Sequence, residues 1–351
     1  MWAPPSMSAL GSSPPFLRVR LLRLFAVGES GVLVALAVLI FVFQALEPAF
    51  ASSGNVRAIL SSLSFLGIIA IGQVILLVGG EFDLSVGSTA GLGAIVSADL
   101  MANKGLPIIV SVIFGLCTGA LVGAINGFLV VRFHVPAFIV TLGMLFVAQG
   151  ATQVITNGQP VYPLPDVVSE VGQATPIFGM GWSILAFVIL GLLADSYLRR
   201  TVPGRTLYAV GGNPLVASLA GVRVERYKFC AFITSGTLAA LAGIFVMGNL
   251  GAGSTAIGQG WELLVIAGVV VGGVSLFGGT GSILGGLVGM LLLQVVQSGL
   301  VVIGVSPNWQ TIAVGSIMIL AVALDVWRRR LPSVESPVTG DQEPNVTAPI
   351  N

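Results

Sequence analysis

The sequence predicts an all-α protein that crosses a membrane about ten times, with both ends on the cytoplasmic side. Three observations lead to this fold class. Hydrophobic residues make up 55% of the 351 residues, only 8% are charged, and the mean hydropathy is +1.01, whereas a soluble chain carries about 25% charged residues. The apolar residues form runs long enough to cross a bilayer. The basic residues gather on one side when these runs alternate in direction.

Ten apolar segments are candidate spans, since about 20 apolar residues cross a bilayer as a helix. The first follows three arginines and is not followed by a small-residue cleavage site, so we expect an uncleaved anchor and not a signal peptide. The third is rich in Gly, Ser and Thr, which leaves open whether it spans fully or is broken. The candidates cover residues 31–50, 59–79, 84–102, 107–131, 136–156, 181–198, 228–250, 262–277, 281–303 and 308–327.

The lysines and arginines orient these spans, because basic residues favour the cytoplasmic side. With the N-terminus inside and ten alternating spans, thirteen basic residues lie inside and only two, Arg57 and Lys104, lie outside. We therefore expect a cytoplasmic N-terminal segment (1–30) and a transmembrane domain (31–330). The polar, proline-containing remainder (331–351) is expected to be a disordered cytoplasmic tail.

The largest internal loop, 199–228, concentrates charge in a chain that has little of it. Within it, Asn213 can cap a short helix that has Pro214 at its first position and Gly221 just past its end. Its apolar side consists of Leu215, Val216, Leu219 and Ala220. A helix of two turns is unstable alone in water, so it must rest either on the protein's own cytoplasmic surface or on a partner.

Many of the 47 glycines lie inside apolar segments. A helix face made of glycines lets two backbones approach closely in lipid, so a spacing of four predicts a packing seam. A second pattern is a faint internal repeat, in which 79, 80 and 87 recur as 278, 279 and 286 at one constant offset. The predicted seams are Gly119, Gly123 and Gly127 in one segment and Gly281, Gly285 and Gly289 in another.

Several classes of activity lack the residues that they need. Neither Lys104 nor Lys228 is followed by Ser or Thr, which excludes a phosphate-binding loop and ATP hydrolysis by that route. His134 is the only histidine and has no catalytic partner, while Cys117 and Cys230 lie in apolar runs that predict neither a disulfide nor a metal site. Ionisable residues fall near span ends, which disfavours a proton- or sodium-coupled carrier.

Polar residues inside two spans follow helical spacing and lie in the outer halves of those spans. Such stripes, together with Trp261, Trp309 and Gln310 at the outer mouth, can line a path for a polyol, which needs neutral amides and aromatic faces. The alternative is interhelical contact, worth about 0.6 kcal/mol each. Both interpretations stay open for each residue. The stripes are Gln149, Thr152, Gln153 and Thr156 in 136–156, and Gln294, Gln297 and Ser298 in 281–303.

Four motifs, in this order along the chain, carry a family resemblance. They are GGEFDLSVGS (79–88), GAINGFLVVRFHVPAFIVTLGM (123–144), GRTLYAVGGNPLVASLAGVRVERYK (204–228) and GGVSLFGGTGSILGGLVG (272–289). Together they resemble the permease subunits of the ribose/xylose/autoinducer-2 class of bacterial ABC importers, over residues 30 to 330. The usual GGIDLSVG of that family stands here with one extra residue and Glu81. Asp83 beside it either caps the following helix or acts in transport.

This resemblance implies a multi-pass inner-membrane permease that imports a monosaccharide or related polyol. It implies a second permease subunit, in a homodimer or a related heterodimer, an extracytoplasmic sugar-binding protein, and a cytoplasmic ATPase subunit that binds the ATP and Mg. The loop 204–228 then carries the coupling helix. The implied ATPase-contact residues are Arg205, Asn213, Pro214, Leu215, Ala217 and Gly221. A stand-alone carrier or channel for a small polar solute is the alternative function.

Overall fold

The computed structural model describes residues 28–176 and 180–330. Within these ranges the regular structure is helical, and an isolated bridge pairs Val161 with Gly253. The predictions for the N-terminal segment before residue 28 and for the tail from residue 331 concern residues outside these ranges.

The helices follow one another with short connections. Their bounds are α2 (Gly28–Leu46), the 3-10 turn η1 (Pro48–Ala51), α3 (Ser53–Val78), α4 (Val86–Ala102), α5 (Ile108–Phe133), α6 (Ala137–Thr156), α7 (Asp166–Gln173), α8 (Trp182–Arg200), α9 (Val202–Gly212), α10 (Pro214–Leu219), α11 (Val224–Leu250), α12 (Trp261–Val271), α13 (Ile283–Val302) and α14 (Pro307–Arg330).

Each of the ten predicted spans coincides with a helix, namely α2 to α6, α8 and α11 to α14. Six of these helices, α3, α5, α6, α8, α11 and α13, are long and apolar enough to cross a membrane by length and composition. Three apolar helices, α2, α4 and α12, are shorter. A polytopic membrane protein fits this pattern. The sequence did not predict α7 and α9.

The prediction for the eighth span, 262–277, was too long. Helix α12 has 11 residues and ends at Val271, because Gly272 closes it and Gly273 turns the chain with a φ of +90°. Eleven helical residues extend about 16 Å, which is about half of the ~30 Å hydrocarbon core. Helix α12 is therefore a half-length helix that ends inside the protein.

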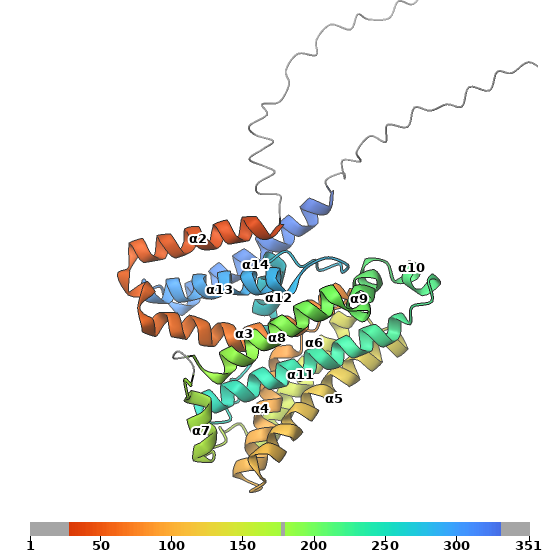
Figure 1. Cartoon of the computed structure of the whole chain (residues 1–351). Coiled ribbons are helices and arrows are strands. Elements are labelled where there is room, and N and C mark those ends of the chain that lie inside the picture. Colours follow the sequence, from red (N-terminus) through yellow and green to blue (C-terminus); the bar gives the residue numbers. More distant parts are fainter. Residues whose placement is uncertain (1–27, 177–179, 331–351) are drawn as a thin grey trace, which may run out of the picture.

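Helix α3 lies at the centre of the molecule, and 83% of its most apolar stretch is buried. Two groups of helices lie around α3, and α3 contacts members of both groups (Figure 1). One group contains α2, α12, α13 and α14, and the other contains α4, α5, α6 and α11. The almost continuously apolar second half of α3, residues 66–78, is explained by this position, because a helical stretch that is buried on every side has no polar face.

The predicted glycine series of 119–127 lies on α5 and faces α11. A methyl group added to Gly119 would collide with the backbone of Gly236, and one added to Gly123 would collide with the carbonyl oxygen of Phe232. Two helix backbones thus approach without side chains between them, which is the packing that small residues allow in lipid.

The second predicted series needs a correction at its first member. Gly281 precedes α13 and has a φ of +135°, so it does not lie on the face of that helix. The two later members, Gly285 and Gly289, do lie on α13, where they contact the backbone of Gly272 and Gly268 at the end of α12. The seam is therefore shorter than the spacing alone indicates.

Three backbone segments meet at the end of the molecule that carries α10, in a contact that we call the glycine junction (Gly80, Gly211, Gly212, Gly278 and Gly279). A methyl group on Gly278 would lie 2.7 Å from the Cα of Gly80, and one on Gly279 would lie 2.6 Å from the Cα of Gly212. The amide of Gly279 donates to the carbonyl of Val78 at 3.0 Å. The junction joins the α3–α4 and α12–α13 connections to the end of α9.

The faint glycine repeat in the sequence does not pair equivalent positions at its first two members. Gly79 and Gly80 end α3, and the glycines in the equivalent place after α12 are Gly272 and Gly273, and not the predicted 278 and 279. Gly278 instead lies against Gly80 in space, at the junction.

Candidate functional site

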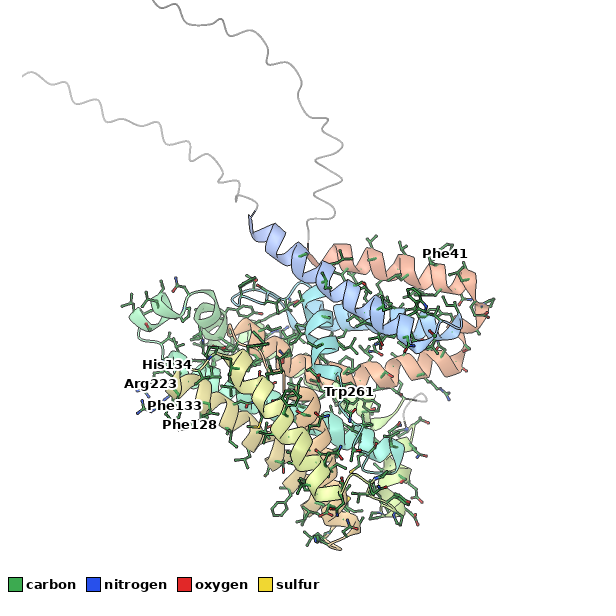
Figure 2. The ribbon with its side chains drawn as sticks, turned by 180° about the vertical axis from the view of Figure 1, so that it is seen from behind. Phe41, Phe128, Phe133, His134, Arg223 and Trp261 are labelled. Carbon is green, nitrogen blue, oxygen red and sulfur yellow. The ribbon has the colours of Figure 1, made fainter. Side chains whose placement is uncertain are left out.

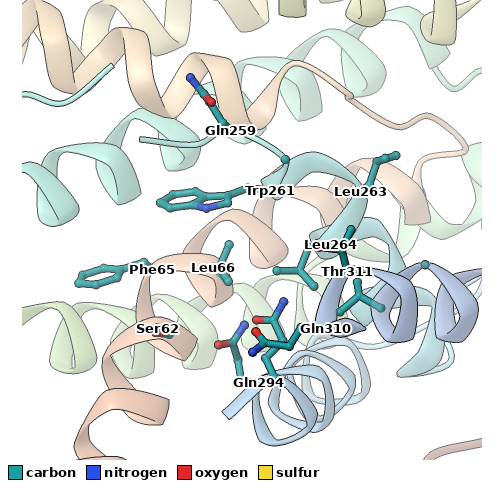
Figure 3. A pocket seen from close by; sticks show the side chains of 14 residues that line it. Ser62, Phe65, Leu66, Gln259, Trp261, Leu263, Leu264, Gln294, Gln310 and Thr311 are labelled. Atoms are coloured by element: carbon teal, nitrogen blue, oxygen red, sulfur yellow. The ribbon is translucent and has the colours of Figure 1, made fainter. Parts of the chain in front are cut away.

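A cavity of about 650 Å³ lies between α3, α12, α13 and α14 (Figure 3). Side-chain amides, hydroxyls and two aromatic rings make up much of its wall. The polar and aromatic lining residues are Ser62, Phe65, Gln259, Trp261, Gln294, Gln297, Gln310 and Thr311. We call this space the larger cavity.

Gln294 is the most deeply placed amide of the larger cavity. Its side chain is 5% exposed, and its Nε2 has no hydrogen-bond partner in the part of the chain that the structure describes. Two other amides are already engaged: Gln310 donates to the carbonyl of Val305 at 2.9 Å, and Gln259 donates to that of Thr255 at 3.0 Å. A buried, unpaired donor costs about 1–3 kcal/mol, so Gln294 is suited to a polar guest.

Trp261 supplies the aromatic surface of the larger cavity. It is the first residue of α12, and Gly260 before it has a φ of +76° that turns the chain into the helix. In the close-up, the indole of Trp261 lies between Gln259 on one side and Phe65 and Leu66 on the other (Figure 3). An apolar face beside hydrogen-bonding amides matches the surface of a small polyol, which has C–H faces and hydroxyl edges.

A second, smaller cavity of about 80 Å³ lies between α4, α6 and the segment that leads into α12. Ser88, Gln149, Thr152 and Glu262 contribute polar atoms to it. Gln259 and Gly260 line both cavities, so one stretch of backbone forms the partition between them.

The two predicted polar stripes therefore reach two different cavities. Gln294 and Gln297 line the larger cavity, and Gln149 and Thr152 line the smaller one. The hydroxyl of Thr152 also donates to the carbonyl of Ala148 in its own helix, at 2.9 Å.

Three predicted path residues line neither cavity. Gln153 is exposed, and the side chain of Trp309 is 64% exposed on the outside of α14. The hydroxyl of Ser298 donates to Asn55 of α3 at 2.8 Å, which is an interhelical contact.

Sequence reasoning missed Ser62, Phe65 and Gln259 as lining residues. Ser62 and Phe65 lie in a serine-containing part of α3 that shows no polar stripe, and Gln259 lies in an irregular segment that has no helical period. One signal could have drawn attention to Gln259, since glycines at 258 and 260 flank it and both have a positive φ.

The predicted short helix in the basic loop is present as α10. The side-chain oxygen of Asn213 accepts from the amide of Val216 at 3.0 Å, Pro214 is the first helical residue, and Gly221 past the end has a φ of +83°. These are the capping contacts that the sequence predicts. Arg205 is exposed on the preceding helix α9.

The apolar side of α10 faces away from the protein. Leu215, Val216 and Leu219 are 69%, 59% and 80% exposed, whereas Ala217 is 5% exposed. Ala217 therefore packs on the chain itself, and the larger apolar residues remain free on the surface. Packing on the protein's own surface does not account for this side of the helix.

The two acidic residues before α4 have different partners. Glu81 forms an ion pair with Lys228 in the first turn of α11, at 2.6 Å. Asp83 is fully buried and accepts from the amide and hydroxyl of Ser85, while Asn126 of α5 donates to the same hydroxyl. Burial raises the pKa of the Asp83 carboxyl, and these hydrogen bonds oppose the rise. Asp83 holds the turn that enters α4.

Residues 55–322 match the family model described as branched-chain amino acid transport system / permease component. This stretch contains α4 to α13, and therefore α10, together with the residues that line both cavities. The chain belongs to this family.

The chain is also similar to named sugar permeases. It is 36% identical over 307 residues to the ribose import permease protein RbsC of Escherichia coli K12, covering 85% of this chain and 93% of the relative. It is 36% identical over 291 residues to the fructose import permease protein FrcC of Rhizobium meliloti, covering 80% of each. The xylose transport system permease protein XylH of Escherichia coli K12 is 32% identical over 355 residues, covering 84% and 90%. No solved structure matches the chain.

Proposed function

We propose that this protein is the permease subunit of an ATP-driven importer for a monosaccharide or a related polyol. Relatives that match 80% or more of its length include import permeases for ribose, fructose and autoinducer 2. The observation that carries the proposal is the larger cavity, where the unpaired amide of Gln294 and the indole of Trp261 line one space.

The chemistry of this lining suits a neutral, hydroxylated ligand. Its polar groups are amides and hydroxyls, which both donate and accept hydrogen bonds, and none of the described residues that line it is charged. A site without charge does not favour an ion, and a branched-chain amino acid would leave its ammonium and carboxylate groups unpaired. A sugar replaces its lost water contacts with amides and places a C–H face on Trp261.

The orientation follows from the basic residues. With about ten crossings and both termini in the cytoplasm, the end that carries α9 and α10 is cytoplasmic, and both cavities lie in the outer half. The half-length helix α12 then enters from the outer side and ends at Gly272, against α13. The protein is thus proposed to receive its ligand from outside.

The exposed side of α10 is the proposed docking site for the ATPase subunit. Leu215, Val216 and Leu219 project from a charge-rich cytoplasmic loop, and apolar side chains in this position favour contact with a partner. The partner binds ATP and Mg and hydrolyses the nucleotide. Import systems of this kind further imply a second permease subunit and an extracytoplasmic binding protein.

Reconstitution separates this proposal from a stand-alone carrier. The chain is placed in liposomes alone and together with its ATPase subunit and binding protein, and uptake of radiolabelled ribose, xylose and fructose is measured with and without ATP. We expect uptake only in the complete, ATP-supplied system. Uptake by the chain alone would support the carrier, and uptake of leucine but of no sugar would reject the proposed ligand class.

A further inference from the structure

Helices α8 and α11 both pack on α3 (Figure 1). A groove lies between them. The groove has a volume of about 390 Å³, and its wall is almost entirely apolar, with Ile71 and Ile75 from α3, Leu190 and Leu193 from α8, and Leu238 from α11. The one hydroxyl among its aliphatic residues, Thr234, already donates to the carbonyl of Cys230 in its own helix. The groove is thus shaped for a hydrocarbon chain and lacks the polar groups that a sugar needs.

A second cavity of about 530 Å³ continues this groove towards the α10 end of the molecule. Tyr197, Tyr227 and Cys230 line both spaces, which makes them contiguous. Arg223 and Arg226 stand at the far end of the second space. One long depression therefore changes from apolar to basic along its length.

The two arginines are free to bind an anion. Both are exposed, and no carboxylate lies within 4 Å of either among residues 28–176 and 180–330. The carboxylates on the neighbouring elements are accounted for, since Asp195 of α8 pairs with Arg199 and Glu81 pairs with Lys228. Glu225 lines a different cavity, beside Pro214. Figure 2 shows Arg223 at the end of the molecule that also carries Phe133 and His134.

We propose that this depression binds an anionic phospholipid of the cytoplasmic leaflet. One acyl chain lies in the groove between α8 and α11, and the phosphate group meets Arg223 and Arg226. Tyr197 and Tyr227 stand where the two parts join, which is the position that tyrosines favour at the membrane–water interface. Basic pockets between helices on the cytoplasmic side recognise anionic headgroups in this way. The proposal rests on the orientation given above.

The bound lipid would contact the segment that follows the proposed coupling helix. Gly221 and Val222 line the same cavity as the arginines, and α10 ends two residues before Gly221. The amide of Val222 donates to the carbonyl of Ala217, so this segment and α10 form one hydrogen-bonded unit. A phospholipid in the depression therefore supports the position of α10 from the membrane side.

The native Cys230 can report the binding of a lipid at this site. Only two cysteines are present, and Cys117→Ser leaves Cys230, which is exposed and lines both spaces, as the single thiol. The full-length chain in detergent is titrated with phosphatidylglycerol or with phosphatidylcholine, and the rate of maleimide labelling at Cys230 is measured. We expect phosphatidylglycerol to slow labelling at a lower concentration than phosphatidylcholine does.

Charge variants test the headgroup contact. Each of Arg223→Gln and Arg226→Gln should raise the phosphatidylglycerol concentration for half-protection about fivefold, and the double variant about thirtyfold. The response to phosphatidylcholine should not change. Arg205→Gln, which removes an exposed charge from α9 outside the depression, should leave both titrations unchanged.

Three results would overturn the proposal. Equal protection by the two lipids would mean that the groove takes hydrocarbon without regard to the headgroup. Protection by inorganic phosphate alone would mean an anion site without a lipid. Protection that rises with protein concentration in the absence of added lipid would mean that a second copy of the chain covers the groove. Because transport is not measured, a failure of the sugar proposal leaves this test intact.

Discussion

The two halves of the central helix α3 have opposite surroundings. Ser62 and Phe65, at the end of its first half, border a cavity of about 650 Å³, whereas its last residue, Val78, accepts a hydrogen bond within the glycine junction. The first space is lined by amides and aromatic rings and stays hollow. Glycines have no side chains to keep backbones apart, so the second space closes. The chain thus keeps one end hollow and closes the other with different residue types.

Substitution at the glycine junction should have the largest effect. Gly211→Val places a side chain against the carbonyl of Val78 and the amide of Gly279. Overpacking costs about 1–3 kcal/mol or more, and backbone atoms cannot move aside as a side chain can. We expect a strong fall in the thermal midpoint of the purified chain in detergent.

A matched control for Gly211→Val is Gly150→Val in α6. Gly150 has no atom within 4 Å of an added methyl group and no positive φ. Its midpoint should stay near that of the unchanged protein. Equal midpoints for the two variants would show that the junction is not closely packed in the membrane protein.

The surface of α10 at the sealed end offers the next largest effect. Leu219 is 80% exposed, so Leu219→Glu should leave membrane levels unchanged. A central apolar contact in an interface contributes about 2 kcal/mol or more, so co-purification of the ATPase subunit and uptake should both fall. Leu219→Met keeps the apolar contact and should behave normally. Loss of the folded protein, without a specific loss of the ATPase, would contradict the docking role.

The hollow end is tested through its unpaired amide. Gln294→Leu keeps the size of the side chain and removes the hydrogen bonds that its amide offers a ligand, each of which contributes about 0.5–1.5 kcal/mol. We expect sugar uptake to fall about tenfold or more at equal membrane levels, with the ATPase still bound. Gln149→Leu tests the smaller cavity in the same way. Gln153→Leu, on an exposed amide that lines neither cavity, should transport normally. If Gln294→Leu also transports normally, the amide serves only helix packing.

The smallest effect is expected at the ion pair beside the junction. Glu81→Gln removes the partner of Lys228, whose side chain is 18% exposed. The partial exposure of both side chains limits the loss to about 1 kcal/mol, to be measured as a shift of the thermal midpoint at low salt. The shift should shrink only in part at high salt, because partly buried charges are screened less than exposed ones. A shift that does not depend on salt would indicate a packing effect.

The sequence predicted well those features that depend on residues close together in the chain. Apolar runs predicted a helix at every candidate span, and the order Asn213, Pro214, Gly221 predicted α10 with its caps. Each of these signals depends on neighbours along the chain, which are present in the sequence itself. The length of α12 was missed, because Gly272 and Gly273 end it inside an apolar run that hydropathy treats as continuous.

By itself, the sequence determined a helical chain for a lipid solvent, its capped turns and the polar residues available for a ligand. The tertiary structure alone decided which of these residues share a space. It placed Gln294 with Trp261 and Phe65, separated Gln149 into a second cavity, and turned Trp309 outward. The physical reason is that a helix face is fixed by local geometry, whereas the space between faces depends on contacts between α3, α12, α13 and α14, which are far apart in the sequence.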